Sequence, residues 1–153
     1  MNHQIIAQIN ELDTFIEKAA VTQLAVSKAS VGWHIEHTLA VIVSTAKLLA
    51  AADPLTYSPT FSVAKWIILT TATIPRGKAK APASVCPTTV ANQATLTKYI
   101  ENAKISYTSL QHLPANLYFN HPYFGHLNIK AYSKFLLVHN KHHLKIIKDL
   151  LKH

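Results

Sequence analysis

Hydrophobic residues recur every three or four positions along several long stretches of the chain, which is the spacing of one face of an α-helix. The first such stretch covers residues 3–20. The second begins near Ser30, a favourable N-cap residue, and ends at Asp53, because a residue that precedes proline avoids helical geometry. This second stretch is apolar on nearly all sides, so we expect its helix to lie at the centre of the fold.

Proline interrupts the periodic pattern between residues 53 and 88. A short helix over residues 61–73 fits inside this segment, and the remainder is predicted to be an extended loop. A connection this long can cross from one end of a helical bundle to the other. The prolines of the segment are Pro54, Pro59, Pro75, Pro82 and Pro87.

Two further helices are predicted, over residues 89–111 and 129–151, with Asn128 as the N-cap of the last. The segment between them, 112–127, is rich in aromatic residues and is predicted to be a loop. Together these patterns predict an all-α fold. It is a four-helix bundle with a long crossover between its second and third helices, in a single domain over residues 1–153.

The composition agrees with a helical protein of the cytoplasm. The chain has 153 residues, 49% of them hydrophobic, and only 3 glycines, too few for a turn-rich β-fold. Cys86 is the single cysteine, which excludes an internal disulfide and a cysteine metal cage and suits a reducing cytosol. The N-terminus lacks the pattern of a signal peptide. The longest apolar stretch is interrupted by Lys65 and is shorter than the roughly 20 residues that span a bilayer, so we expect no membrane insertion.

The last predicted helix places histidines where core residues belong. At about 100° per residue, His139 and His143 fall on its apolar arc, whereas His142 lies toward the flank. The opposite arc is a lysine stripe without interleaved aromatic residues, which argues for solubility and against nucleic-acid binding, despite the net charge of +8. The apolar arc also holds Tyr132, Leu136, Ile146 and Leu150, and the stripe holds Lys130, Lys134, Lys141, Lys145, Lys148 and Lys152.

Two imidazoles four residues apart project from the same side of a helix, and this H-x-x-x-H pair is a recurrent way to hold a divalent cation. The pair could equally be core residues hydrogen-bonded to tyrosine or to backbone carbonyls. On the second helix, His37 faces the same side as Trp33 and is the best third ligand. Glu36 and His34 are expected to point elsewhere, with Glu36 either supporting the ligands from behind or facing solvent.

The segments "WHIEH" and "HNKHH" resemble the aromatic-x-x-x-His and H-x-x-x-H motifs of the DinB-like superfamily, which includes YfiT-type metal hydrolases. The segments "IPRGKAKAP" and "HPYFGHL" resemble one branch of it whose function is unknown. The resemblance covers most of the chain. It implies an up-down-down-up helical bundle in which His37, His139 and His143 bind a divalent Zn, Ni or Fe ion.

Three imidazoles leave coordination positions open, as in catalytic rather than structural metal sites. The superfamily includes S-transferases that use low-molecular-weight thiols. The resemblance therefore implies a metal-dependent enzyme with a small-molecule substrate, either such a transferase or a hydrolase. No catalytic residue can be assigned, because the sequence shows no recognisable Ser-His-Asp set. The alternative is a non-catalytic metal- or ligand-binding bundle, for which we also consider a homodimer through its outer helices.

Three other features leave their roles open. The loop "NHPYFGH", with the segment from His121 to Gly125 at its centre, either lines a pocket at the mouth of the bundle or caps the core with packed aromatic rings. Arg76 and the lysines that follow it either attract an anionic substrate or form a solvated loop. Cys86 lies in a proline-flanked loop, and we expect it to be incidental.

Overall fold

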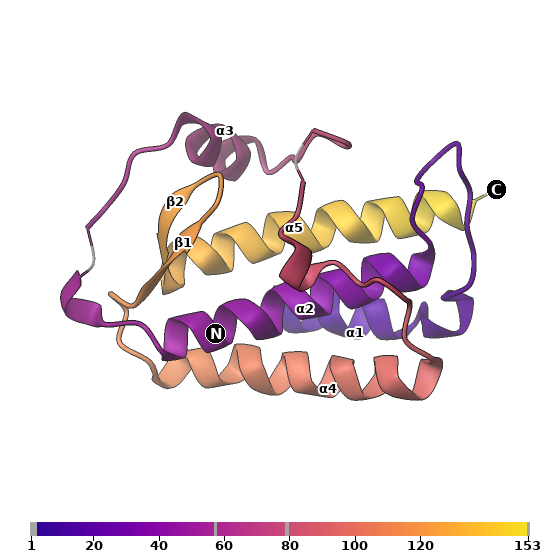
Figure 1. Cartoon of the computed structure of the whole chain (residues 1–153), viewed down its shortest axis with the longest axis horizontal. Coiled ribbons are helices and arrows are strands. Elements are labelled where there is room, and N and C mark those ends of the chain that lie inside the picture. The colour runs from indigo at the N-terminus through magenta and orange to yellow at the C-terminus, as the bar shows by residue number, and fades with distance from the viewer. Residues whose placement is uncertain (1–2, 57, 79, 153) are drawn as a thin grey trace.

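The structure is a computed structural model that describes residues 3–56, 58–78 and 80–152. Over these residues the chain is mostly helical with one small two-stranded sheet (Figure 1), so the predicted helical fold is confirmed. The elements are α1 (His3–Asp13), α2 (Val31–Ala50), α3 (Val63–Thr71), α4 (Gln93–Ser109), β1 (Tyr118–His121), β2 (Gly125–Asn128) and α5 (Ile129–Leu150).

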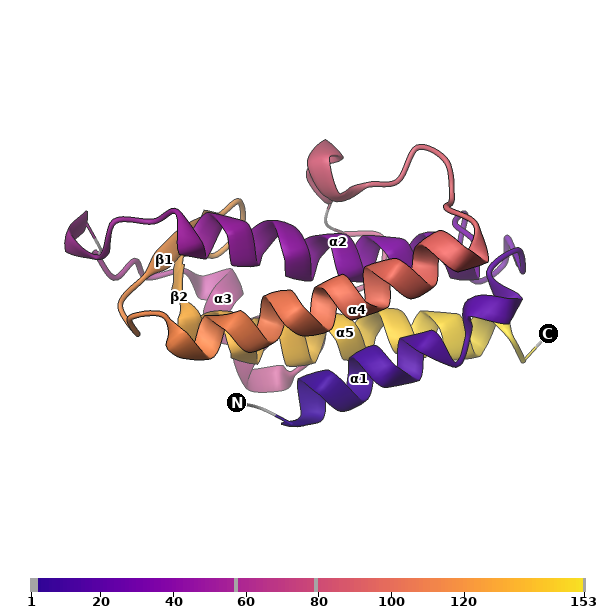
Figure 2. The same cartoon turned by 90° about the horizontal axis from the view of Figure 1, so that it is seen from below.

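Helices α1, α2, α4 and α5 lie side by side along the long axis of the molecule (Figures 1 and 2). Helix α2 packs against α4 and α5, and α1 packs against the same two helices from the other side. Leucine and isoleucine side chains from all four are fully buried between them, each stabilising the fold by about 1.5–3 kcal/mol. Helix α2 also touches β1 and the 3-10 turns over Ile16–Lys18, Ala83–Val85 and Leu110–His112, which agrees with its apolar sequence.

Side-chain caps fix where four of the helices begin, including α3, where the Ser62 hydroxyl accepts a hydrogen bond from the Lys65 N–H at 3.2 Å. The Ser30 hydroxyl accepts a hydrogen bond from the Trp33 N–H at 3.2 Å, and Asn128 Oδ1 accepts one from the Ala131 N–H at 2.9 Å. Both predicted caps are therefore confirmed. Asn92 caps α4 in the same way, so that helix begins at Gln93 rather than at residue 89.

Helix α1 is shorter than the sequence predicted, since it ends at Asp13 instead of residue 20. The Phe15 N–H bonds to the Leu12 carbonyl three residues back, and the chain continues into a 3-10 turn over Ile16–Lys18. This tighter turn still buries Ile16 against the core. The apolar spacing runs on past the end of the helix, so hydrophobic periodicity could not show where it stops.

The segment before α5 is a β-hairpin and not a loop, which corrects the prediction. Strands β1 and β2 are antiparallel, with His121 opposite Gly125 at the turn. Gly125 adopts φ +65°, in the left-handed region that favours glycine. Phe119 and Leu127 face each other across the strands, and both are buried. Strands of four residues are too short to show a convincing alternation in the sequence.

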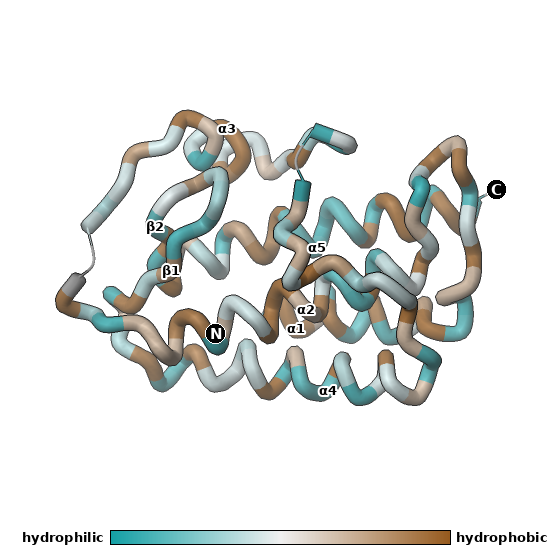
Figure 3. Tube along the Cα trace, viewed as in Figure 1, coloured by the Kyte–Doolittle hydropathy of each residue, from teal (hydrophilic) through white to brown (hydrophobic). Residues whose placement is uncertain are grey.

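The connection between α2 and α4 runs along the outside of the helices and carries α3 (Figure 1). Helix α3 lies within the predicted range 61–73 and packs against α5 without a fully buried residue. Its outer side is apolar, with Trp66 63% exposed and Phe61, just before the helix, 84% exposed. Figure 3 shows the hydrophobic residues along this helix. None of the helices over the described residues has the length and apolar character to cross a membrane.

Candidate metal centre

Helices α2 and α5 bring three buried histidines together where they pack. One ring nitrogen each from His37, His139 and His143 lies within 4.8 Å of the other two. The ring centroids of His139 and His143 are 4.5 Å apart, and those of His37 and His143 are 4.8 Å apart. The structure thus gathers the three predicted ligands closely enough to bind one metal ion. We refer to these residues as the histidine triad.

The aromatic residue of the "WHIEH" motif orients the His37 ring. The Trp33 indole stacks on the His37 imidazole at a centroid distance of 4.9 Å and an interplanar angle of 15°. The indole N–H donates a hydrogen bond to the Pro87 carbonyl at 3.2 Å. Trp33 therefore holds the end of the crossover against α2 and fixes one side of the His37 ring.

One ring nitrogen of His37, Nδ1, is held by a main-chain oxygen of the crossover. His37 Nδ1 lies 2.8 Å from the Val85 carbonyl oxygen. A carbonyl only accepts, so Nδ1 carries the hydrogen and the lone pair of the neutral ring is on Nε2. A backbone carbonyl that fixes the tautomer in this way is a common support for a metal-binding histidine. The role of Val85 could not be predicted from the sequence, because the contact involves its main-chain oxygen.

His139 supplies a test of whether the triad suits a metal ion. Its Nδ1 is buried and has no hydrogen-bond partner among the described residues. Leaving a buried polar atom unpaired costs about 1–3 kcal/mol. An unpaired imidazole nitrogen beside two other imidazoles fits a cation site, because coordination gives such a ring a partner that the protein does not.

Burial keeps the triad uncharged at neutral pH. It lowers the pKa of His37, and it holds the pKa of His139 and of His143 well below the usual value. The neighbouring histidines add to the shifts of His139 and His143, because like charges so close together repel. The rings therefore offer neutral nitrogen donors, which suit Zn, Ni, Fe or Cu better than Mg or Ca.

His34 does not point away from the triad as predicted. It is 4% exposed, and its Nδ1 lies 3.0 Å from His143 Nδ1. Its Nε2 lies 3.0 Å from the Ser27 hydroxyl. Residues three apart on a helix occupy adjacent faces, and α5 covers both the face of His34 and that of His37. The i, i+3 spacing places His34 beside the face of His37, but how much of α2 is covered by α5 depends on packing, and nothing in the sequence pointed to Ser27.

Glu36 is not one of the clustered ligands, as expected, and it binds a main-chain amide instead. Its Oε2 accepts a hydrogen bond from the Ala91 N–H at 2.9 Å, and its side chain is half-buried. The carboxylate thus fixes the chain just before α4 and does not reach the triad. No carboxylate belongs to the metal-ligand cluster found among the described residues.

The hairpin covers one side of the triad with aromatic rings. The His121 ring stacks on Phe124 at 4.3 Å and lies 4.9 Å from the Phe135 ring. Phe135 in turn is 5.2 Å from His139. Burial lowers the pKa of His121 to about 4. This packing agrees with the expectation of an aromatic cap.

Arg76 reaches the C-terminal end of α5. Its guanidinium pairs with the Asp149 carboxylate at 2.6 Å, which lowers the pKa of Asp149. Arg76 also adds to the effect of burial in lowering the pKa of His34 and of His142. The described residues around Arg76 are exposed, as in a solvated loop, and this ion pair ties Arg76 to the last turn of α5. Cys86 is half-buried next to Val85, and its thiol makes only a weak contact with the Ala81 carbonyl at 3.8 Å.

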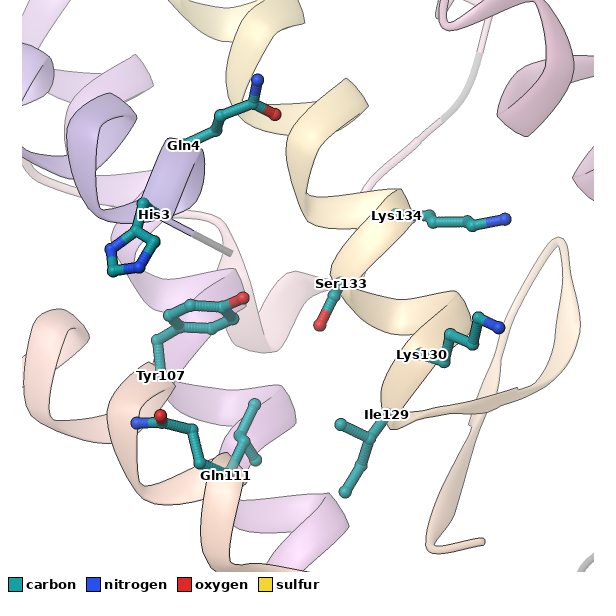
Figure 4. A pocket seen from close by; sticks show the side chains of 9 residues that line it. His3, Gln4, Tyr107, Gln111, Ile129, Lys130, Ser133 and Lys134 are labelled. Atoms are coloured by element: carbon teal, nitrogen blue, oxygen red, sulfur yellow. The ribbon is translucent and has the colours of Figure 1, made fainter. Parts of the chain in front are cut away.

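Two cavities lie elsewhere on the molecule. The larger, about 720 Å³, opens between α1, α4 and α5, and Figure 4 shows the side chains around it, including Tyr107 and Ser133. The other, about 390 Å³, lies beside α3 and is lined by Phe61, Trp66 and Lys65. Neither is lined by a residue of the triad.

Comparisons of the chain with models of protein families, with curated proteins and with solved structures found no match.

Proposed function

We propose that this protein is a metal-dependent enzyme of the DinB-like superfamily, with an up-down-down-up four-helix bundle as its fold. In this proposal a divalent Zn, Ni or Fe ion is held by His37, His139 and His143. The reaction is either transfer to a low-molecular-weight thiol or hydrolysis of a small molecule. The observation that carries the proposal is the convergence of three buried imidazole nitrogens within 4.8 Å.

The composition of the triad favours an anionic reactant. Three neutral imidazoles bring no negative charge, and no carboxylate joins them among the described residues. When bound, the metal would supply Lewis acidity that lowers the pKa of a water or a thiol at its open positions. The protein's part is to keep the ligand nitrogens unprotonated and to fix their directions.

The surrounding residues supply that support. Trp33 and the Val85 carbonyl set the plane and the tautomer of His37. Phe135 packs between the rings of His121 and His139, which shields the triad from water on the side of the hairpin. A shielded site strengthens the electrostatic interactions of a bound ion with its reactant.

Elemental analysis of the purified protein tests the metal site. We expect about one divalent ion per chain in the wild type and its loss in the double variant His139→Ala, His143→Ala. The matched control is His112→Ala, which removes an exposed histidine outside the cluster and should leave the metal content unchanged. Full retention of metal in the double variant, with its helical circular dichroism intact, would rule out the triad as the site.

The two reactions are separated with the Co²⁺-loaded protein. Binding of a small thiol as thiolate to Co²⁺ produces a sulfur-to-cobalt charge-transfer band, which supports a transferase. Turnover in ester, amide and phosphate hydrolysis screens without such a band supports a hydrolase.

A non-catalytic metal-binding protein is the second candidate. The rings of the triad are at most 7% exposed, and neither cavity described above reaches them. This candidate predicts stoichiometric metal, no thiolate band and no turnover in any screen.

A further inference from the structure

Ser27, His34 and His143 form a continuous line of hydrogen bonds that ends at the triad. The Ser27 hydroxyl lies 3.0 Å from His34 Nε2, and His34 Nδ1 lies 3.0 Å from His143 Nδ1. His34 and His143 are both buried, and Ser27 is half-buried. The line occupies the Nδ1 of His143, so only Nε2 of that ring is left to bind a metal ion.

Each contact in this line requires one donor and one acceptor, and a neutral imidazole has one N–H and one acceptor nitrogen. Two arrangements of hydrogens satisfy these conditions. In the first, His143 Nδ1–H donates to His34 Nδ1, and His34 Nε2–H donates to Ser27. In the second, Ser27 donates to His34 Nε2, and His34 Nδ1–H donates to His143 Nδ1.

The two arrangements differ in what they leave on the far side of His143. The first leaves Nε2 of His143 with a free lone pair. The second places the hydrogen on Nε2, so that this nitrogen cannot coordinate a metal ion. The Ser27 oxygen also accepts a hydrogen bond from the Ala29 N–H at 3.1 Å. Its two lone pairs can accept from Ala29 and from His34 together, as the first arrangement requires.

We propose that His34, held by Ser27, is a positioning residue that accepts the Nδ1 hydrogen of His143 and so presents Nε2 of His143 to the metal ion. This inference rests on the proposed metal site. In this role His34 accepts the Nδ1 hydrogen of His143, as the Val85 carbonyl accepts that of His37. Through Ser27, the turn before α2 holds His34 in place. The hydrogen bond from the Ser27 N–H to the Gln23 carbonyl, at 3.0 Å, closes this turn.

The variants follow from the geometry of the imidazole. In His34→Asn, the amide oxygen takes the place of Nδ1, so the acceptor for His143 is kept while the contact with Ser27 is lost. In His34→Leu, the acceptor is lost and the volume is largely filled. His142→Leu is the matched control, since the His142 ring packs edge-on against the His143 ring, with 5.1 Å between their centroids.

The first readout is the tautomer of His143 in the metal-free protein, measured by long-range ¹H–¹⁵N NMR of the imidazoles. We expect the hydrogen on Nδ1 in the wild type, in His34→Asn and in His142→Leu, and a mixture of tautomers in His34→Leu. A wild-type His143 that carries its hydrogen on Nε2 would overturn the proposal. This measurement needs no metal, so it decides the role of His34 even where the proposed metal site fails.

The second readout is the dissociation constant of Co²⁺ or Zn²⁺, measured by competition with a chromophoric chelator. We expect His34→Leu to weaken binding by about 10–100-fold, as loss of a partner behind a ligand does. His34→Asn and His142→Leu should stay within about threefold of the wild type, a small change on the same scale. Equal affinity of His34→Leu and the wild type contradicts the proposal. If His34→Leu does not fold, His34→Asn and Ser27→Ala keep the test open, because Ser27→Ala should mix the tautomers of His143.

Discussion

The indole of Trp33 lies nearly parallel to the imidazole of His37, with 4.9 Å between their centroids, and the indole N–H donates a hydrogen bond to the Pro87 carbonyl. One side chain therefore joins the central helix, a triad histidine and the crossover. The aromatic residue of the motif has two separable tasks here, stacking and hydrogen bonding, and a change that removes only one of them can tell them apart.

Trp33→Phe keeps an aromatic ring against His37 but removes the hydrogen bond to Pro87. We expect it to lower the free energy of unfolding by about 1 kcal/mol, the usual worth of such a bond, and to leave metal affinity nearly unchanged. Trp33→Ala removes the stacking as well and should weaken both stability and metal binding. Urea denaturation and metal titration measure the two effects, and an identical outcome for both variants would refute this division of tasks.

Metal binding should stabilise the folded protein. An ion that binds only the folded state adds about 2.7 kcal/mol to the free energy of unfolding at a free concentration of 100 times its dissociation constant. We expect a chelator to remove this gain and to lower the melting temperature of the wild type. His37→Ala should melt at the same temperature with and without metal, because its triad is incomplete. Differential scanning fluorimetry at several metal concentrations measures the shift.

Acid should destabilise the metal-free protein through its buried histidines. Since the pKa of His121 is about 4 in the folded state and near 6.5 in the unfolded chain, the unfolded state binds more protons between these values. The contribution of neutral His121 to the free energy of unfolding is full above pH 6.5 and is lost as the pH falls toward 4. Each such histidine adds at most about 1.4 kcal/mol per pH unit to the slope.

His121→Asn tests this assignment, because the amide oxygen can still accept the Tyr123 N–H that His121 Nδ1 accepts at 3.2 Å. We expect the variant to show a shallower fall of unfolding free energy between pH 6.5 and 4.5, by close to one proton. Urea titrations at fixed pH values give the slope. An unchanged slope in His121→Asn would contradict the lowered pKa of His121.

Gly32 lies where α2 meets the turn before it and the segment before α4. A Cβ added there would stand 2.5 Å from Val90 Cγ1 and 3.0 Å from the Ala19 carbonyl oxygen. We expect Gly32→Ala to cost about 1–3 kcal/mol of stability through this overlap, although alanine favours a helix by about 1 kcal/mol. Val90→Ala removes the nearest atom, so the double variant should recover part of the loss. Chemical denaturation of the three variants gives the comparison.

The sequence predicted what depends on periodicity and local capping. The sequence predicted the three triad histidines because His139 and His143 share one helical face and His37 shares a face with Trp33. The caps at Ser30 and Asn128 were found because a short polar side chain there bonds to the first turn.

What the sequence could not predict depends on which elements meet in space. His34 was assigned to the wrong side, because the width of the face that α5 covers on α2 is a property of packing. The hairpin was missed because its pairing involves main-chain atoms of two very short strands. The role of Ser27 arises only when the turn before α2 folds back beside His34.

The bond from His37 to Val85 is made to a main-chain oxygen. Replacing Val85 by another small apolar residue would therefore leave that oxygen in position. The support of His37 does not depend on which side chain stands at position 85. Shifting the backbone there, by an insertion or deletion between residues 82 and 87, would instead release both His37 and Trp33 at once. For this stretch of the crossover, length should be constrained far more tightly than composition.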